Sequence, residues 1–114
     1  MIIRKEEASA IDFSGLRILD YTANSSEKSS FAVIDVPAGV SHKLSWSRRS
    51  DKYYYIISGV LDFTVNNQNF ILKCGDFCAI GKGDKFRYAN SSGEAASVVL
   101  IHTPSFDINE EVFE

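Results

Sequence analysis

Short β-type runs separated by turn residues extend along most of the chain, and no segment keeps a helical period. The clearest pair of runs flanks Asn66-Asn67-Gln68, a polar stretch that predicts a hairpin turn. Nine such runs predict an all-β chain folded as an antiparallel double-sheet barrel. The predicted strands are Leu16–Tyr21, Ser30–Val36, His42–Ser47, Lys52–Ser58, Val60–Asn66, Asn69–Lys73, Phe77–Ile80, Lys85–Ala89 and Ala96–His102.

Length and composition predict that residues 1–114 form one domain. Of the 114 residues, 45% are hydrophobic and 12% aromatic, which is enough to supply a real core. The segments outside the predicted strands are expected to contribute less to the core. Lys5–Ala10 predicts one helical turn, and the acidic tail Asp107–Glu114 is expected to pack only through Phe106, Val112 and Phe113.

The charge balance argues against two classes of partner. A formal net charge of −3 gives no basic surface for nucleic acid or for an anionic membrane. The one basic cluster is Arg48 and Arg49, with Lys52 close by. This cluster has two interpretations, a solvated loop tip or an anion clamp at the mouth of the barrel.

The N-terminal residues and the cysteines bear on the cellular compartment. The segment MIIRKEEASA is charged where a signal peptide needs an apolar run, and no window approaches the length of a membrane span. Cys74 and Cys78 form no recognised metal or redox spacing and are expected to be buried, inert thiols. These features predict a cytoplasmic protein.

Two glycine-marked stretches, Val36–Gly59 and Cys74–Asn90, lie at the centre of the chain. They resemble the two motifs of the cupin family, small β-barrels whose motifs read G-x5-H-x-H-x3/4-E-x6-G and G-x5-P-x-G-x2-H-x3-N. The motif glycines and the closing asparagine are matched by Gly39, Gly59, Gly75, Gly83 and Asn90. The resemblance covers about residues 31–104 and implies a cupin-type jelly-roll barrel.

Other residue types occupy the positions at which the family places its metal ligands. In the register counted from the first glycine, the two histidine positions hold Ser45 and Ser47, and the glutamate position holds Lys52. Phe86 occupies the histidine position of the second motif. A transition-metal site needs several imidazole, thiolate or carboxylate donors at one point. We therefore expect neither a metal nor another cofactor.

The register of the first motif stays open at this point. A shorter spacing would place Trp46 and Arg48 at the histidine positions, and the alternation of Leu44 with Trp46 favours that phase if their face is the apolar one. Neither register supplies a metal ligand, so the expectation holds in both.

The resemblance also implies which side chains face the interior of the barrel. Side chains two apart share one face of a strand, so Lys52 and Tyr54 point the same way. The predicted ligand-binding residues are Ser45, Ser47, Lys52, Tyr54, Phe86 and Tyr88. An aromatic wall with a few polar groups is typical of a small-molecule site, although the same rings would also fill the space left by a metal.

Two functions remain open. The first is a cupin that binds a small organic ligand in the barrel without redox chemistry. The second is a metal-free isomerase or epimerase acting on a sugar or related carbonyl compound, as some members of the family do. The candidate acid and base groups for that reaction are His102, Lys52 and Tyr88, and His42 is a weaker candidate.

Small cupins commonly form dimers, so the resemblance also implies a homodimer. Tyr53 and Tyr55 lie on the face opposite Lys52 and would suit a contact between two sheets. Packing against the N-terminal strands would explain the two tyrosines as well.

Overall fold

The computed structural model describes all residues, 1–114, as eleven β-strands and two short 3₁₀ helices, η1 (Lys5–Glu7) and η2 (Ile108–Glu110). In chain order the strands are β1 (Ser9–Phe13), β2 (Leu16–Asp20), β3 (Ser30–Val36), β4 (Ser41–Ser47), β5 (Asp51–Ser58), β6 (Val60–Val65), β7 (Gln68–Lys73), β8 (Phe77–Ile80), β9 (Phe86–Ala89), β10 (Ala96–Thr103) and β11 (Glu111–Phe113).

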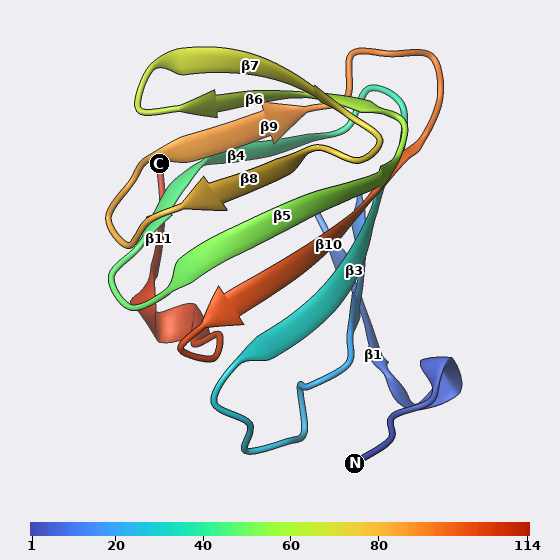
Figure 1. Cartoon of the computed structure of the whole chain (residues 1–114), viewed down its shortest axis with the longest axis vertical. Coiled ribbons are helices and arrows are strands. Elements are labelled where there is room, and N and C mark those ends of the chain that lie inside the picture. Colours follow the sequence, from blue (N-terminus) through green and yellow to red (C-terminus); the bar gives the residue numbers. More distant parts are fainter.

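The strands form two antiparallel sheets that face each other (Figure 1). One sheet has six strands in the order β1-β2-β3-β10-β5-β8, and the other has five in the order β11-β4-β9-β6-β7. The N-terminal hairpin β1-β2 thus extends the first sheet, and the C-terminal strand β11 extends the second. This architecture confirms the predicted all-β double-sheet barrel.

The nine predicted strands are all present, and each end lies within one residue of its predicted position. Two further strands, β1 and β11, were not predicted. Only three residues of the predicted turn Lys5–Ala10 form a helix, because Ser9 and Ala10 instead pair with β2. The C-terminal tail is more ordered than predicted, since β11 pairs with β4 from Glu111 to Phe113.

Two turns depend on unusual backbone conformations. Asn66 and Asn67, between β6 and β7, both have positive φ values, 48° and 67°, as a two-residue hairpin loop requires. Gly59, between β5 and β6, has a φ of 81°. A Cβ atom at Gly59 would lie 2.7 Å from the Cα of Ala96, so glycine is also required for the close approach of the two chain segments.

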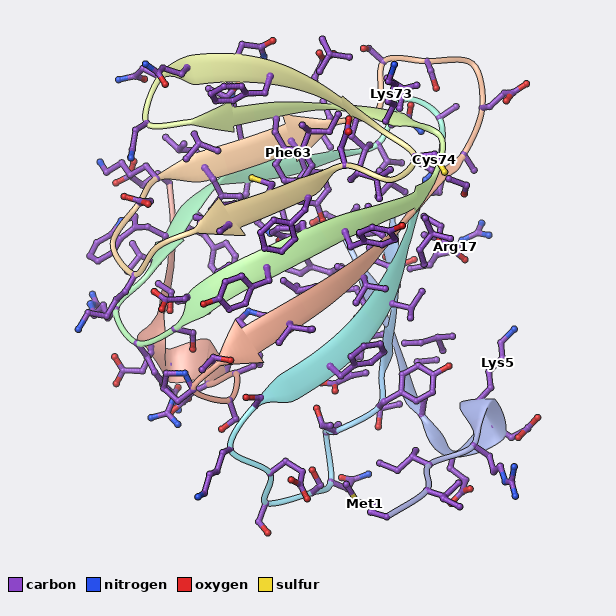
Figure 2. The ribbon with its side chains drawn as sticks, viewed as in Figure 1. Met1, Lys5, Arg17, Phe63, Lys73 and Cys74 are labelled. Atoms are coloured by element: carbon purple, nitrogen blue, oxygen red, sulfur yellow. The ribbon has the colours of Figure 1, made fainter.

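The core fills the space between the two sheets. Thirteen buried hydrophobic residues form one cluster, and Figure 2 shows Phe63 among the side chains between the sheets. The Phe63 ring stacks on Tyr88 with ring centroids 4.9 Å apart and meets the edge of Tyr54 at 5.2 Å. Both helices are single turns of three residues, and neither is long and apolar enough to cross a membrane.

The cysteines differ from the sequence prediction. Cys74 is exposed and Cys78 is half-buried, so the expectation of two buried thiols was wrong. Cys74 lies directly after the edge strand β7, in the tight turn that leads to β8 (Figure 2), where its side chain faces outward. Its thiol donates to the carbonyl of Ile57 at 3.1 Å.

Candidate functional site

A cavity of about 300 Å³ lies inside the barrel, close to the lower end of the range found for small-molecule sites. Twelve of its 18 lining residues are hydrophobic, counting Tyr54 and Tyr88, so a ligand would meet mainly apolar and aromatic surface. The N-terminal hairpin contributes Phe13 and Leu16, and the C-terminal segment contributes Phe106 and Phe113. The remaining, polar residues are Asp20, Ser30, His42, Lys52, His102 and Glu111.

The structure brings four of the predicted site residues to this cavity. Lys52 and Tyr54 come from β5, Tyr88 from β9 and His102 from β10. Each is almost fully buried, with exposed fractions of 5% or less. Their strands belong to both sheets, so the cavity is enclosed from two sides.

Three other predicted residues are buried behind the cavity wall rather than on it. The Ser47 hydroxyl accepts the backbone N–H groups of Arg49 at 3.1 Å and Ser50 at 2.9 Å, so it stabilises the turn after β4. The Phe86 ring packs behind Lys52, whose Nζ lies 5.1 Å from the ring centroid. The Ser45 hydroxyl is buried without a hydrogen-bond partner.

The burial of Ser45 and Ser47 decides the register of the first motif. Both are at most 2% exposed, whereas Arg48 lies on the surface. Trp46, between them on β4, is half-buried on the opposite face of the strand, and its backbone pairs with Val112 of β11. The register counted from the first glycine is therefore the one that the structure adopts.

His42 lines the cavity because β4 contains a β-bulge. In the pairing of β4 with β9, His42 lies opposite Tyr88 and Ser45 lies opposite Phe86. The chain thus advances three residues on β4 but only two on β9, so β4 carries one extra residue. The extra residue reverses the alternation of side chains, and both His42 and Ser45 face inward. Simple alternation back from Ser45 would place His42 on the outer face. The sequence analysis named His42 only as a weaker acid–base candidate, and the bulge is what brings this residue to the cavity wall.

One ring nitrogen of His42 is already bonded. The ring stacks on Phe86 and Tyr88, with centroids 5.2 Å and 5.1 Å away. Nδ1 lies 2.7 Å from the carbonyl oxygen of Lys43, and a carbonyl only accepts, so Nδ1 carries the proton. Nε2 then has a free lone pair. Burial lowers the pKa of His42 to about 4, so the ring is neutral at pH 7.

Lys52 forms a buried ion pair with Glu111. Its Nζ bonds Oε1 of Glu111, and the two side chains are only 5% and 3% exposed. Burial lowers the pKa of Lys52, and the negative charge of Glu111 opposes that shift. Glu111 lies on β11, a strand that the sequence analysis did not predict, and no motif signalled its role. The ion pair joins the C-terminal strand to the centre of the barrel.

The two cavity tyrosines keep their protons at neutral pH. Burial raises the pKa of both Tyr54 and Tyr88 well above the usual value. Their rings meet edge to face, with centroids 5.6 Å apart. The Tyr88 hydroxyl is buried and has no hydrogen-bond partner. A buried hydroxyl without a partner is costly, so this atom is a natural contact for a ligand.

Among the cavity-lining residues, His102 is the second, after Tyr88, with a buried atom that has no partner, its Nε2. It lies opposite Lys52 in the pairing of β10 with β5, and its ring meets Phe106 edge to face at 5.1 Å. Burial lowers the pKa of His102 to about 3, and the positive charge of Lys52 acts in the same direction. His102 is therefore a neutral hydrogen-bonding group at pH 7.

The basic residues Arg48 and Arg49 do not reach the cavity. The Arg48 guanidinium lies 5.6 Å from the centroid of Trp46 on the outer surface. Arg49 donates through Nε to the carbonyl of Ser105 at 2.8 Å. Of the two interpretations of this cluster, the anion clamp does not match these positions.

The cavity does not fit the metal site that the family usually carries. Its four ligand positions hold two serines, an ammonium group paired with a carboxylate, and a phenyl ring that stacks on His42. No group of three or more His, Cys, Asp or Glu side chains is placed to hold a metal ion. The donors that a transition metal needs are not present at this point.

The fold and the cavity thus define a small β-barrel protein with an aromatic-walled internal site. The sequence matches the Cupin domain family over residues 32–102, more than half of its length. The chain belongs to the cupin family. Among curated proteins, no relative matches the sequence.

Solved structures with the same fold include Pac13 of Streptomyces, a nucleoside dehydratase. It is 18% identical, with a TM-score of 0.87 over 100% of this chain and 90% of that one. Three single-residue variants of Pac13, one at a histidine and two at tyrosines, have structures with uridine. A predicted oxalate decarboxylase of Thermotoga maritima is 20% identical, with a TM-score of 0.80 over 91% of this chain and 99% of its own.

A third similar structure is the cupin domain of Cnp3 from Schizosaccharomyces pombe. It is 18% identical, with a TM-score of 0.75 over 87% of this chain and 70% of that one. At 18–20% sequence identity, these structural similarities establish the fold of the chain and nothing beyond it.

Proposed function

We propose that the cavity binds a small organic ligand with a ring and hydroxyl groups, and that its acid and base groups act on this ligand without a bound metal. The ligand class is a nucleoside or a sugar-like carbonyl compound. The observation that carries the proposal is the convergence of His42, Tyr88 and the Lys52–Glu111 pair on one largely apolar cavity. Apolar walls suit the faces of a ring, and the few polar groups suit its substituents.

The likeness to the Streptomyces nucleoside dehydratase supports a nucleoside as the first ligand to test. The variants of that protein solved with uridine change one histidine and two tyrosines. The cavity of this chain holds the same residue types in His42, Tyr54 and Tyr88. The shared residue types add weight to a proposal that rests on the cavity itself.

The proposed reaction is the loss of water from a carbonyl compound with a hydroxyl group on its β carbon. Nε2 of His42 accepts a proton from the carbon beside the carbonyl, and the electron pair of that bond forms an enolate. An N–H of the Lys52 ammonium that does not bond Glu111 donates to the enolate oxygen, and the imidazolium formed on His42 in the same step balances the new negative charge. The electron pair of the enolate then forms a carbon–carbon double bond between the two carbons, and the hydroxyl group leaves. This hydroxyl takes the proton back from His42 and departs as water. The Tyr88 hydroxyl holds the leaving group.

An epimerase or isomerase is the second candidate, and the position of His102 favours it. His42 lies on β4 of one sheet and His102 on β10 of the other, and both line the cavity. Epimerisation removes a proton from one face of a carbon and returns one to the opposite face, so two groups on opposite sides of the ligand suit it. The first proton transfer is the same in both reactions.

The experiment combines binding with product analysis. The protein, dialysed against EDTA, is first tested for saturable thermal stabilisation by uridine and by a panel of neutral sugars. Compounds that bind, and their carbonyl derivatives, are then incubated with it in D2O and examined by mass spectrometry. A product lighter by one water indicates dehydration, whereas deuterium incorporation without that loss indicates epimerisation. Stabilisation without either change indicates a binding protein.

Matched variants test the assigned roles. His42→Gln keeps a polar side chain of similar length but removes the base, so we expect binding to persist and conversion or exchange to stop. His102→Gln should stop epimerisation but leave dehydration measurable. If no compound stabilises the protein, or if EDTA removes the activity and a transition metal restores it, the proposal is wrong.

A further inference from the structure

The cavity has no free positive charge with which to hold an anion. Lys52 is the one lysine or arginine among the lining residues, and its ammonium is already bonded to Glu111. Asp20, on β2, adds a second carboxylate to the wall. The Asp20 carboxylate accepts the backbone N–H of Thr22 at 3.0 Å, and no lysine or arginine pairs with it.

The other nearby cations lie outside the cavity wall. Arg49 is bonded to Ser105 on the surface, and Arg48 lies over Trp46. Lys43 is exposed, and its Nζ lies 5.2 Å from the centroid of the Phe113 ring. None of these three residues lines the cavity. The one cation that an anionic group on a bound ligand could meet is therefore the Lys52 ammonium, whose charge Glu111 already offsets.

We infer that the cavity takes the uncharged, unphosphorylated form of its ligand and rejects the corresponding phosphate. This inference rests on the proposed function and specifies the substrate class for the same site. A phosphate that enters leaves water and meets two carboxylates and one ammonium that is already paired. Because the pKa values of His42 and His102 are about 4 and 3, the two imidazoles contribute no positive charge at pH 7.

The test compares three forms of one ligand by isothermal titration calorimetry with the full chain at pH 7. The probes are uridine, uridine 5′-monophosphate and the dimethyl ester of that monophosphate, which is larger than the monophosphate but uncharged. We expect the neutral ester to bind within about tenfold of uridine. The monophosphate should bind at least about a hundredfold more weakly, because a buried, unpaired anion is strongly disfavoured.

The possible outcomes separate the two ideas. If the monophosphate binds as tightly as uridine, the inference is wrong while the proposed function stands. If the neutral ester is excluded as strongly as the monophosphate, size and not charge selects the ligand, and the inference is again wrong. If neither uridine nor any neutral sugar of the panel binds, the proposed function itself fails, and the inference fails with it.

Discussion

Removal of either partner of the buried Lys52–Glu111 pair should strongly destabilise the protein. Glu111→Gln leaves the Lys52 ammonium in the barrel without a carboxylate, and Lys52→Met leaves the carboxylate without its cation. Each side chain is at most 5% exposed, so water cannot replace the lost partner. Breaking a buried pair in this way costs about 3–5 kcal/mol. For a chain of 114 residues this corresponds to a fall in Tm of roughly 10–20 °C.

The double variant separates pairing from burial. Lys52→Met combined with Glu111→Gln removes both charges, so it should cost clearly less than the sum of the two single changes. Urea unfolding of all four proteins at pH 7, followed by circular dichroism, gives the coupling energy directly. We expect a coupling of more than about 2 kcal/mol, since each single variant carries the penalty of an unpaired buried group.

A second ion pair supplies a matched control. Lys85 and Glu114 also join the barrel to the C-terminal segment, with a distance of 3.0 Å, but their side chains are 52% and 40% exposed. The same cycle on this pair should give less than about 1 kcal/mol, because solvent screens the interaction. Equal coupling in the two pairs would refute the argument that burial makes the Lys52–Glu111 pair strong.

Three further outcomes follow from the geometry. In the folded protein the pKa of His42 is about 4 and that of His102 about 3, whereas both are 6.5 in the unfolded chain. As pH falls below 6.5 the unfolded chain therefore binds protons that the folded protein does not. Each histidine then lowers the free energy of unfolding by about 1.4 kcal/mol per pH unit. Urea titrations from pH 7 to pH 5 should show that slope reduced in His42→Gln and in His102→Gln. Gly59→Ala should cost about 2–4 kcal/mol in the same assay, and Gly93→Ala, in open space, less than about 1. The predicted homodimer is tested by Tyr55→Lys, which should convert a dimer to a monomer in light scattering and would leave an existing monomer unchanged.

Much of the fold could be predicted because its signals are local. The nine strands that were predicted have turn residues at their ends and alternate in hydrophobicity, and both features can be read from a few neighbouring residues. Gly59 and the Asn66-Asn67 turn require particular backbone conformations, which few other residues adopt. The inward positions of Lys52, Tyr54 and Tyr88 followed from a motif register that burial supports.

His42 could not be placed from the sequence because its orientation depends on a β-bulge. The residues between His42 and Ser45 carry no glycine or other turn signal to mark the extra residue. The bulge becomes visible only when β4 is paired with β9, which is a contact between distant parts of the chain. The residue that we propose as the base is therefore the one that simple alternation assigns to the outer face.

Glu111 was missed for a different reason. Its neighbours form a three-residue strand, too short for a pattern to be recognised, and the acidic composition of the tail is typical of a solvated segment. The strand exists because β11 pairs with β4, and the carboxylate of Glu111 then meets Lys52. A buried lysine on β5 was itself the available signal, since such a residue needs an acidic partner from somewhere in the chain.

The exchange of the family's glutamate position for Lys52 changes what the C-terminal segment does. An ammonium at the centre of the barrel would be an unpaired buried charge without β11, so the C-terminal strand is part of the site and not an appendage. A metal ion would add a positive charge that its ligands balance only in part, and it would attract anions. Lys52 adds a charge that one carboxylate cancels. The cavity therefore has strong local dipoles with little positive excess, which suits a polar but uncharged ligand.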